Sequence, residues 1–110
     1  TGMKADRISG WPKIVPRLDD GSYDPVAIEA SRYIDAVNFA ARCQAEAIVS
    51  VGFIDRTCPP TSVYAAYNVL PGKKSILNYP AMGHAATTEI REEFRAALLQ
   101  HVGKDAAPRP

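Results

Sequence analysis

Residues 45–84 constrain the fold more than any other part of this sequence. They open with an almost unbroken apolar run rich in β-branched residues, 46–54, which is typical of a strand covered on both faces of a parallel sheet. A helix is predicted over 61–70, between the punctuating Pro-Pro and Pro-Gly pairs, and a second strand over 74–79. A strand, a crossover helix and a parallel strand form one unit, so the sequence predicts an α/β fold.

Two further helices are expected to flank this unit. Asp24-Pro25 combines an N-cap with proline at the first helical position, and apolar residues at helical spacing predict one helix over about 25–42. Thr87 or Thr88 is expected to cap the last helix, and Gly103 to end it. The apolar stripe predicted to be buried on that helix comprises Ile90, Phe94, Ala97, Leu98 and Val102.

These patterns divide the chain into three parts. Residues 1–24 carry turn signals without periodicity and are expected to form a loop or lid, with Trp11 as its anchor. Residues 25–103 form the α/β unit, and residues 104–110 a frayed tail. Two parallel strands cannot bury the apolar faces of three helices. We therefore expect either a segment of a larger sheet or a homo-oligomer, and in a monomer an exposed apolar patch and a bare strand edge.

Composition argues against several classes of partner. The 110 residues carry a net charge of +1 without a basic stripe, so no nucleic-acid partner is expected. No apolar run approaches the roughly 20 residues of a membrane helix, so no membrane partner is expected. No phosphate-binding loop or metal-ligand spacing appears, and we predict no cofactor and no metal. Cys43 and Cys58 are expected to be reduced. Cytoplasmic and secreted locations both remain open.

Two titratable residues mark successive strand ends, where ligands collect in open parallel sheets. Asp55 follows the first strand, and His84 lies in the loop after the second. A carboxylate that orients a histidine, and a histidine that acts as general base, are two members of a nucleophilic triad. Taken without His84, Asp55 is better explained as a helix-capping or turn-forming residue, and His84 by itself is also explained as an exposed loop residue. Gly83 is expected to allow a tight backbone and close approach to substrate.

The third member of such a triad is missing from the pattern. The sequence contains no GxSxG, and none of its serines lies at a strand-to-helix elbow. His101, in the last helix, is expected to lie on the surface.

An ordered set of short motifs extends this interpretation. The motifs are YIDAVNFA at 33–40, SVGFID at 50–55, CPP at 58–60, YAAYN at 64–68 and Gly83-His84. Together they resemble the C-terminal part of the acetylxylan esterases and cephalosporin-C deacetylases, carbohydrate esterase family seven, within the alpha/beta-hydrolase fold. The similarity runs from about Gly10 to about Phe94.

The resemblance implies a serine esterase that removes acetyl groups from xylan, acetylated sugars or similar small esters without a metal. Asp55 matches the family's triad acid and His84 its triad histidine, whereas Ala85 stands where the family usually has Glu. The family's serine and oxyanion hole lie in its N-terminal part. The chain is therefore expected to be a C-terminal segment of an alpha/beta-hydrolase fold, with two parallel strands and flanking helices. Its expected partners are the missing N-terminal part and an acetylated carbohydrate or small ester.

Two other interpretations stay open at this point. The chain could be a non-catalytic remnant that serves as a binding or assembly module, for which oligomerisation is expected. It could also be a receiver-like or nucleotide-binding doubly wound domain that uses Asp55 at a strand end, although no acidic cluster or glycine fingerprint accompanies that residue.

Overall fold

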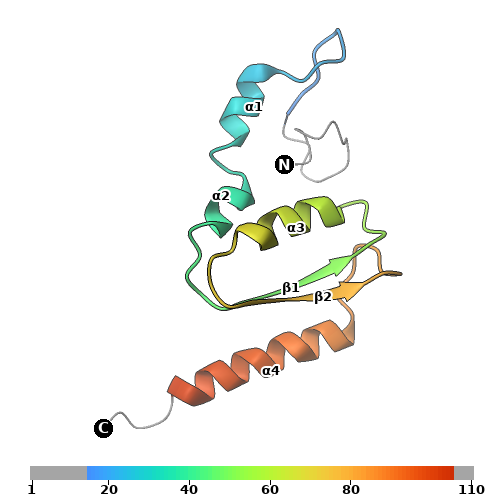
Figure 1. Ribbon diagram of the computed structural model, residues 1–110. Helices are drawn as coiled ribbons and strands as arrows, with labels where there is room; N and C mark the ends of the chain where they lie inside the picture. Colours follow the sequence, from blue (N-terminus) through green and yellow to red (C-terminus); the bar gives the residue numbers. More distant parts are fainter. Residues whose placement is uncertain (1–14, 106–110) are drawn as a thin grey trace.

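Figure 1 shows the computed structural model, which describes residues 15–105 of the chain. Trp11 and its predicted anchoring role lie outside the described residues. The elements run in the order α1 (Pro25–Ser31), α2 (Ala36–Ala40), β1 (Ala47–Gly52), α3 (Pro60–Val69), β2 (Lys74–Tyr79) and α4 (Thr88–Asp105). Residues 15–24, before α1, form a turn held by an isolated antiparallel bridge between Arg17 and Tyr23.

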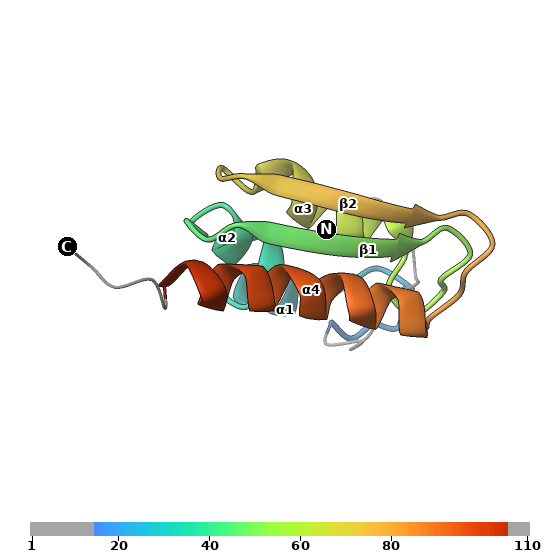
Figure 2. The same cartoon turned by 90° about the horizontal axis from the view of Figure 1, so that it is seen from below.

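The sheet consists of β1 and β2, which pair in parallel from Ala47 opposite Lys74 to Gly52 opposite Tyr79. α3 connects them and covers one face of the sheet together with α2, while α4 lies on the opposite face (Figures 1 and 2). The predicted fold class, two parallel strands with flanking helices, is confirmed. The helix start at Asp24 is confirmed as well, because its carboxylate accepts hydrogen bonds from Val26 and Ala27 N–H at 2.8 and 3.4 Å.

The single helix predicted over 25–42 is wrong, because the chain forms α1 and α2 with a break between them. Asp35 ends the break by accepting a hydrogen bond from Val37 N–H at 3.1 Å, so it acts as the N-cap of a second helix. Asn38 Nδ2 then donates to the carbonyl of Arg32 at 2.6 Å and fixes the bend. Local side-chain hydrogen bonds therefore override the continuous apolar periodicity.

The first strand is shorter than the predicted 46–54, since it ends at Gly52. Asp55 N–H donates to the Gly52 carbonyl at 3.3 Å, which closes a turn directly after the strand. Phe53 and Ile54 belong to this turn rather than to the strand, and their side chains are exposed. Helices lie on both faces of β1 (Figures 1 and 2), but only Val51 and Gly52 are fully buried, and residues 47–50 stay partly exposed.

The buried stripe predicted on α4 is wrong beyond its first turn. Ile90 is fully buried, but Phe94, Leu98 and Val102 are 38%, 62% and 55% exposed. The sheet is only two strands wide, and within residues 15–105 no other element covers the rest of this helix face. α4 also continues past Gly103 to Asp105, because Gly103 does not adopt the positive φ that would end the helix there.

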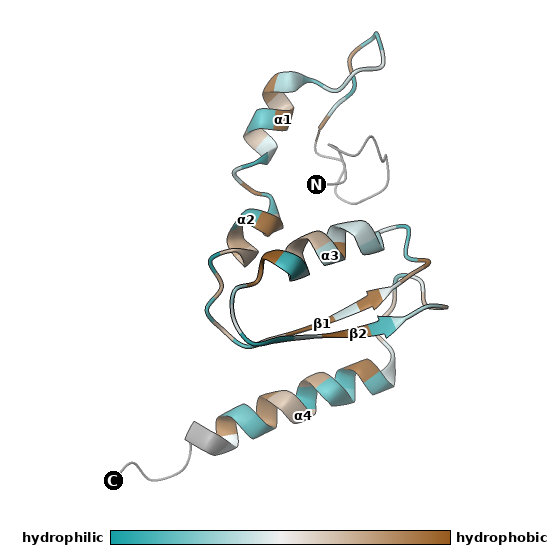
Figure 3. Ribbon diagram, in the orientation of Figure 1, coloured by the Kyte–Doolittle hydropathy of each residue, from teal (hydrophilic) through white to brown (hydrophobic). Residues whose placement is uncertain are grey.

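The described part of the chain has a very small core. Its buried apolar side chains are Val15, Val51 and Ile90, while Tyr33 and Ile34 are exposed. Figure 3 colours the ribbon by hydropathy and shows hydrophobic and hydrophilic residues interspersed along the helices. The radius of gyration is 17.3 Å, against roughly 13 Å for a compact domain of this length. Exposed apolar side chains and a bare edge on β1 were expected for the chain by itself, and both are found within residues 15–105. A homo-oligomer stays a prediction.

Candidate active site

The loops that follow β1 and β2 are joined by backbone hydrogen bonds at the carboxyl end of the sheet. Phe53 N–H donates to the Tyr79 carbonyl at 3.1 Å and extends the strand pairing by one residue. Ile54 N–H then donates to the Met82 carbonyl at 3.2 Å. These bonds hold the two loops side by side, which places Asp55 of the first loop next to His84 of the second.

Gly52 allows the second loop to approach the end of β1 closely. A Cβ atom at this position would lie 2.3 Å from the Met82 carbonyl oxygen and 2.7 Å from that of Gly83, distances that no side chain tolerates. A Cβ at Gly83 would meet nothing within 4 Å, so the tight backbone expected there is wrong. The glycine that the site requires is Gly52, and no pattern in the sequence singles it out.

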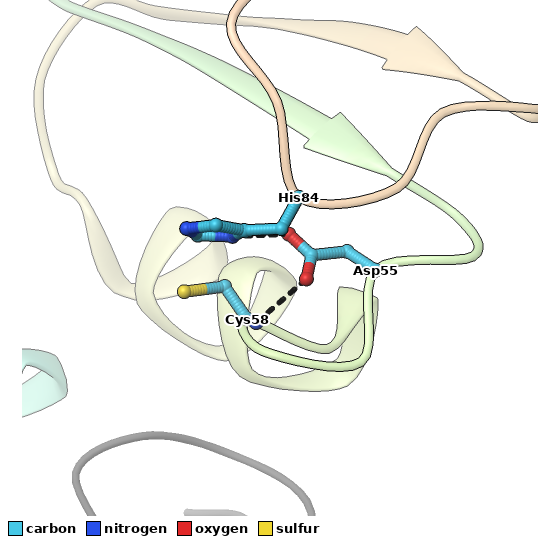
Figure 4. A group of neighbouring side chains, drawn as sticks. All are labelled: Asp55, Cys58 and His84. Carbon is cyan, nitrogen blue, oxygen red and sulfur yellow. Dashed lines mark hydrogen bonds and ion pairs between the residues drawn. The ribbon is translucent and has the colours of Figure 1, made fainter.

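Asp55 and His84 are hydrogen-bonded, as Figure 4 shows. The distance between His84 Nδ1 and Asp55 Oδ2 is 2.9 Å, within the reach that the sequence predicted. The Asp55 side chain is 9% exposed, whereas that of His84 is 60% exposed. Because Nδ1 faces the carboxylate, Nε2 on the far side of the ring is available to a second partner.

The other carboxylate oxygen of Asp55 is fixed by the backbone that follows it. Oδ1 accepts hydrogen bonds from Thr57 N–H at 2.8 Å and from Cys58 N–H at 2.9 Å. Asp55 is thus also the turn-forming residue that one interpretation of the sequence expected. The turn-forming role and the role beside His84 are compatible, because Oδ1 accepts the hydrogen bonds of the turn while Oδ2 faces the imidazole.

The environment of Asp55 favours its ionised form. Burial is the largest single influence and raises the pKa of this carboxyl. The hydrogen bonds from Cys58, His84 and Thr57, together with the charge of His84, outweigh burial and hold the pKa below its ordinary value of 3.8. The carboxylate is therefore charged at neutral pH and able to stabilise a protonated imidazole.

Cys58 lies beside this pair, which sequence reasoning missed. Its sulfur, an Asp55 oxygen and a His84 ring nitrogen all lie within 4.8 Å of one another. A local pattern could have indicated this. An Asp in a turn often accepts a hydrogen bond from the N–H of the residue three positions later, and here that bond brings Cys58 next to the Asp55 carboxylate. Cys43 and Cys58 are both free thiols, as expected.

Other residues considered in the sequence lie apart from this cluster. None of the serines within residues 15–105 forms a hydrogen bond with His84. His101 is exposed on α4, as predicted.

Among the described helices, none has the length and apolar character needed to cross a membrane. A surface hollow of about 450 Å³ lies elsewhere and is lined by Arg32, Tyr33, Asn38, Phe39, Ala41 and Arg42.

Comparison with known proteins places these features in a family. Residues 20–102 match the acetyl xylan esterase family. The chain is 32% identical over 88 residues to acetyl esterase Axe7A of Xylanibacter ruminicola, which covers 80% of this chain and 20% of that protein.

Two relatives of known structure agree with the chain in structure as well as in sequence. An acetyl xylan esterase from Paenibacillus sp. R4 superposes with a TM-score of 0.61 at 31% identity, over 68% of this chain and 23% of that one. Acetyl xylan esterase 1 from Thermoanaerobacterium sp. JW/SL YS485 superposes with a TM-score of 0.66 at 32% identity, over 76% of this chain and 27% of that one. The chain thus spans between a fifth and about a quarter of the length of these relatives. It belongs to the acetyl xylan esterase family.

Proposed function

We propose that this chain supplies the acid and the base of a serine carboxylic-ester hydrolase that removes acetyl groups from xylan or acetylated sugars. The observation that carries the proposal is the 2.9 Å hydrogen bond between His84 Nδ1 and Asp55 Oδ2. It orients the imidazole so that Nε2 faces outward on a ring that is 60% exposed. An acyl-transfer base needs this arrangement, with one nitrogen on the carboxylate and the other on the nucleophile.

The two residues divide the work in this proposal. His84 Nε2 removes the proton of a serine hydroxyl as the hydroxyl attacks the acetyl carbonyl, and then gives that proton to the departing sugar oxygen. Asp55 keeps the Nδ1 proton in place and stabilises the imidazolium that forms between these steps. The lowered pKa of Asp55 suits this role, because a carboxyl that stays ionised can offset the new positive charge.

The serine and the oxyanion hole come from polypeptide outside these 110 residues. This part of the proposal is supported by the relatives, which are about four to five times longer than the region they share with the chain. It is also supported by the described serines, none of which forms a hydrogen bond with His84 within residues 15–105. The exposed ring of His84 is open to a nucleophile carried by such a segment, the proposed partner of this chain.

Hydrolysis of p-nitrophenyl acetate by the isolated chain tests the division of labour. We expect turnover no faster than that of free imidazole, because the base has no activated hydroxyl and no oxyanion hole to work with. A rapid turnover that His84→Ala abolishes would contradict this and would reveal a nucleophile within the chain. A rapid turnover that survives His84→Ala would identify a contaminant, and the preparation would be repurified.

A polypeptide that joins this chain to a serine-bearing segment of the family tests the roles themselves. In that enzyme, Asp55→Asn is expected to lower kcat about 10⁴-fold with little effect on KM, since the amide holds the imidazole in the wrong tautomer. His101→Gln is the matched control and is expected to leave kcat unchanged. Equal kcat values for Asp55→Asn and the parent would rule out the triad, and an inactive joined enzyme would favour a binding or assembly role.

A further inference from the structure

Three chemically different donor groups meet at the open end of the sheet. The Cys58 sulfur, a His84 ring nitrogen and an Asp55 carboxylate oxygen lie within 4.8 Å of one another (Figure 4). The acid and base of the proposed function account for two of them, whereas the thiol has no part in that chemistry. Thiolate, imidazole and carboxylate are the side chains that bind Zn²⁺ in proteins.

The spacing of the three donors is close to that of a tetrahedral zinc site. Bond lengths of about 2.3 Å to sulfur and about 2.0–2.2 Å to nitrogen and oxygen place neighbouring ligands roughly 3.3–3.6 Å apart. His84 Nδ1 and Asp55 Oδ2 are 2.9 Å apart, slightly closer than this, and every donor pair lies within 4.8 Å. Small side-chain rotations therefore suffice to build the site.

Two members of the cluster are exposed and can rotate, whereas the third is held in place. The Asp55 carboxylate is held by Thr57 and Cys58 N–H and its side chain is 9% exposed, so it offers a fixed first ligand. The side chain of His84 is 60% exposed and Cys58 is also exposed, so both can adjust and an ion can reach them from solvent.

We propose that Asp55, Cys58 and His84 form a binding site for a thiophilic divalent cation of the Zn²⁺ type, with a water molecule as the fourth ligand. Binding releases the thiol proton of Cys58 to solvent, because the thiolate is the ligand. The ion replaces the hydrogen between Nδ1 and Oδ2, and the imidazole then carries its proton on Nε2. Metal binding and the Asp55–His84 hydrogen bond are therefore mutually exclusive. Hard cations such as Mg²⁺, which prefer oxygen ligands, are excluded.

Metal titrations of the reduced 110-residue chain under argon test this site without any measurement of activity. We expect calorimetry to show one Zn²⁺ bound per chain, and Co²⁺ to produce a thiolate-to-cobalt charge-transfer band that Zn²⁺ abolishes. Cys58→Ser should weaken Zn²⁺ binding at least roughly 10–100-fold and remove the band. Cys43→Ser is the matched control and should change neither readout. Mg²⁺ at the same concentrations should release no heat.

Two more variants distinguish a three-ligand site from a metal adduct of a single thiol. Asp55→Asn and His84→Gln keep Cys58 in place, and each should weaken Zn²⁺ binding at least about tenfold. Circular dichroism establishes that each variant keeps the helical content of the parent chain. Unchanged Zn²⁺ affinity in either variant, or in Cys58→Ser, would overturn the proposal, as would a loss of binding in Cys43→Ser. The proposed esterase function uses the metal-free pair, in which the Asp55–His84 hydrogen bond is intact, so none of these outcomes decides it.

Discussion

Among single residues, Gly52 has the largest expected effect on the Asp55–His84 pair, although it carries no functional group. We predict that Gly52→Ala lowers the free energy of unfolding by about 1–3 kcal/mol and displaces the loop that bears His84. The reason is that the new Cβ would meet the backbone of Met82 at 2.3 Å, and backbone cannot rotate away as a side chain could. Urea unfolding and the imidazole chemical shifts of His84 measure the two effects.

Gly83→Ala provides the matched control for that substitution. A Cβ at Gly83 meets nothing within 4 Å, so the variant should unfold like the parent and keep the His84 shifts unchanged. If both alanine variants behave alike, the close contact between β1 and the second loop is not what positions the histidine.

The pKa of Asp55 gives a prediction of pH dependence at the same scale. The folded pKa lies below 3.8, so ionised Asp55 contributes stability that is fully present above about pH 4 and lost as the pH falls through the folded value. Removing the hydrogen bond and charge of His84 by His84→Ala should raise the pKa of Asp55. Carbon NMR of the carboxyl group during an acid titration measures the shift.

Asp20 serves as an internal reference in the same spectra. Hydrogen bonds from Ser22 lower its pKa, and these do not involve His84. The pKa of Asp20 should therefore be the same in the parent and in His84→Ala. An Asp55 pKa that does not move, or that moves together with that of Asp20, would contradict the assignment of the shift to the imidazole.

The site residues divide into those that local sequence reveals and those that it does not. Asp55 and His84 could be predicted, because each follows a strand and parallel strands bring such ends together. The need for a glycine at position 52 could not be predicted, since it arises from carbonyl groups about 30 residues further along the chain. The position of Cys58 could be predicted only in part. Its turn with Asp55 is local, but its approach to the imidazole requires both loops.

Among the secondary-structure elements, α3 depends on a residue of the following strand. Lys74 Nζ donates to the carbonyls of Tyr67, Asn68 and Leu70 at 3.0, 3.1 and 2.9 Å, which satisfies the carbonyl groups at the end of the helix. The same ammonium lies 4.9 Å from the centre of the Tyr67 ring. We predict that Lys74→Met, which keeps the apolar stem, lowers the free energy of unfolding by about 1–3 kcal/mol.

Lys73 offers a matched control in the neighbouring position. Its ammonium pairs with Glu46 at 2.7 Å, but the two side chains are 78% and 53% exposed, so water and salt weaken the interaction. Lys73→Met should therefore cost at most about 1 kcal/mol. Equal unfolding midpoints for the two variants in urea would show that Lys74 does not stabilise the end of α3.

The elements also show where sequence patterns are reliable. The second strand was predicted with its observed bounds, 74–79, because a Pro-Gly pair precedes it and a proline follows it. The bounds of the helix over 25–42 were predicted wrongly, because periodicity carries no information on whether Asp35 faces solvent or caps a new helix. The stripe on α4 failed for a third reason, since periodicity identifies an apolar face but not whether this chain contains anything to cover it.

For the molecule as a whole, the two-stranded sheet leaves a large apolar surface uncovered. The accessible surface is 8220 Å², against roughly 5900 Å² for a compact protein of 11.9 kDa. β1 pairs with β2 on one side, and within residues 15–105 no strand occupies its other side. A bare strand edge favours pairing with another chain or segment.

Hydrogen exchange along β1 tests whether this edge is complete in the isolated chain. Ala47 N–H donates to the carbonyl of Lys73, just before β2, and Phe53 N–H donates to that of Tyr79 at its end. Successive amides of a strand point to opposite sides, so those of Ile48 and Ser50 point to the bare edge. We predict that in a monomeric chain the backbone amides of Ile48 and Ser50 exchange much faster than those of Val49 and Val51.

Sedimentation at several concentrations establishes whether the monomer or an oligomer is measured. If the chain forms a homo-oligomer through this edge, or is joined to the serine-bearing segment, exchange at Ile48 and Ser50 should slow. Slow exchange at all four positions in a monomer would show that β1 needs no further strand, and the inference that another chain or segment completes the sheet would fail.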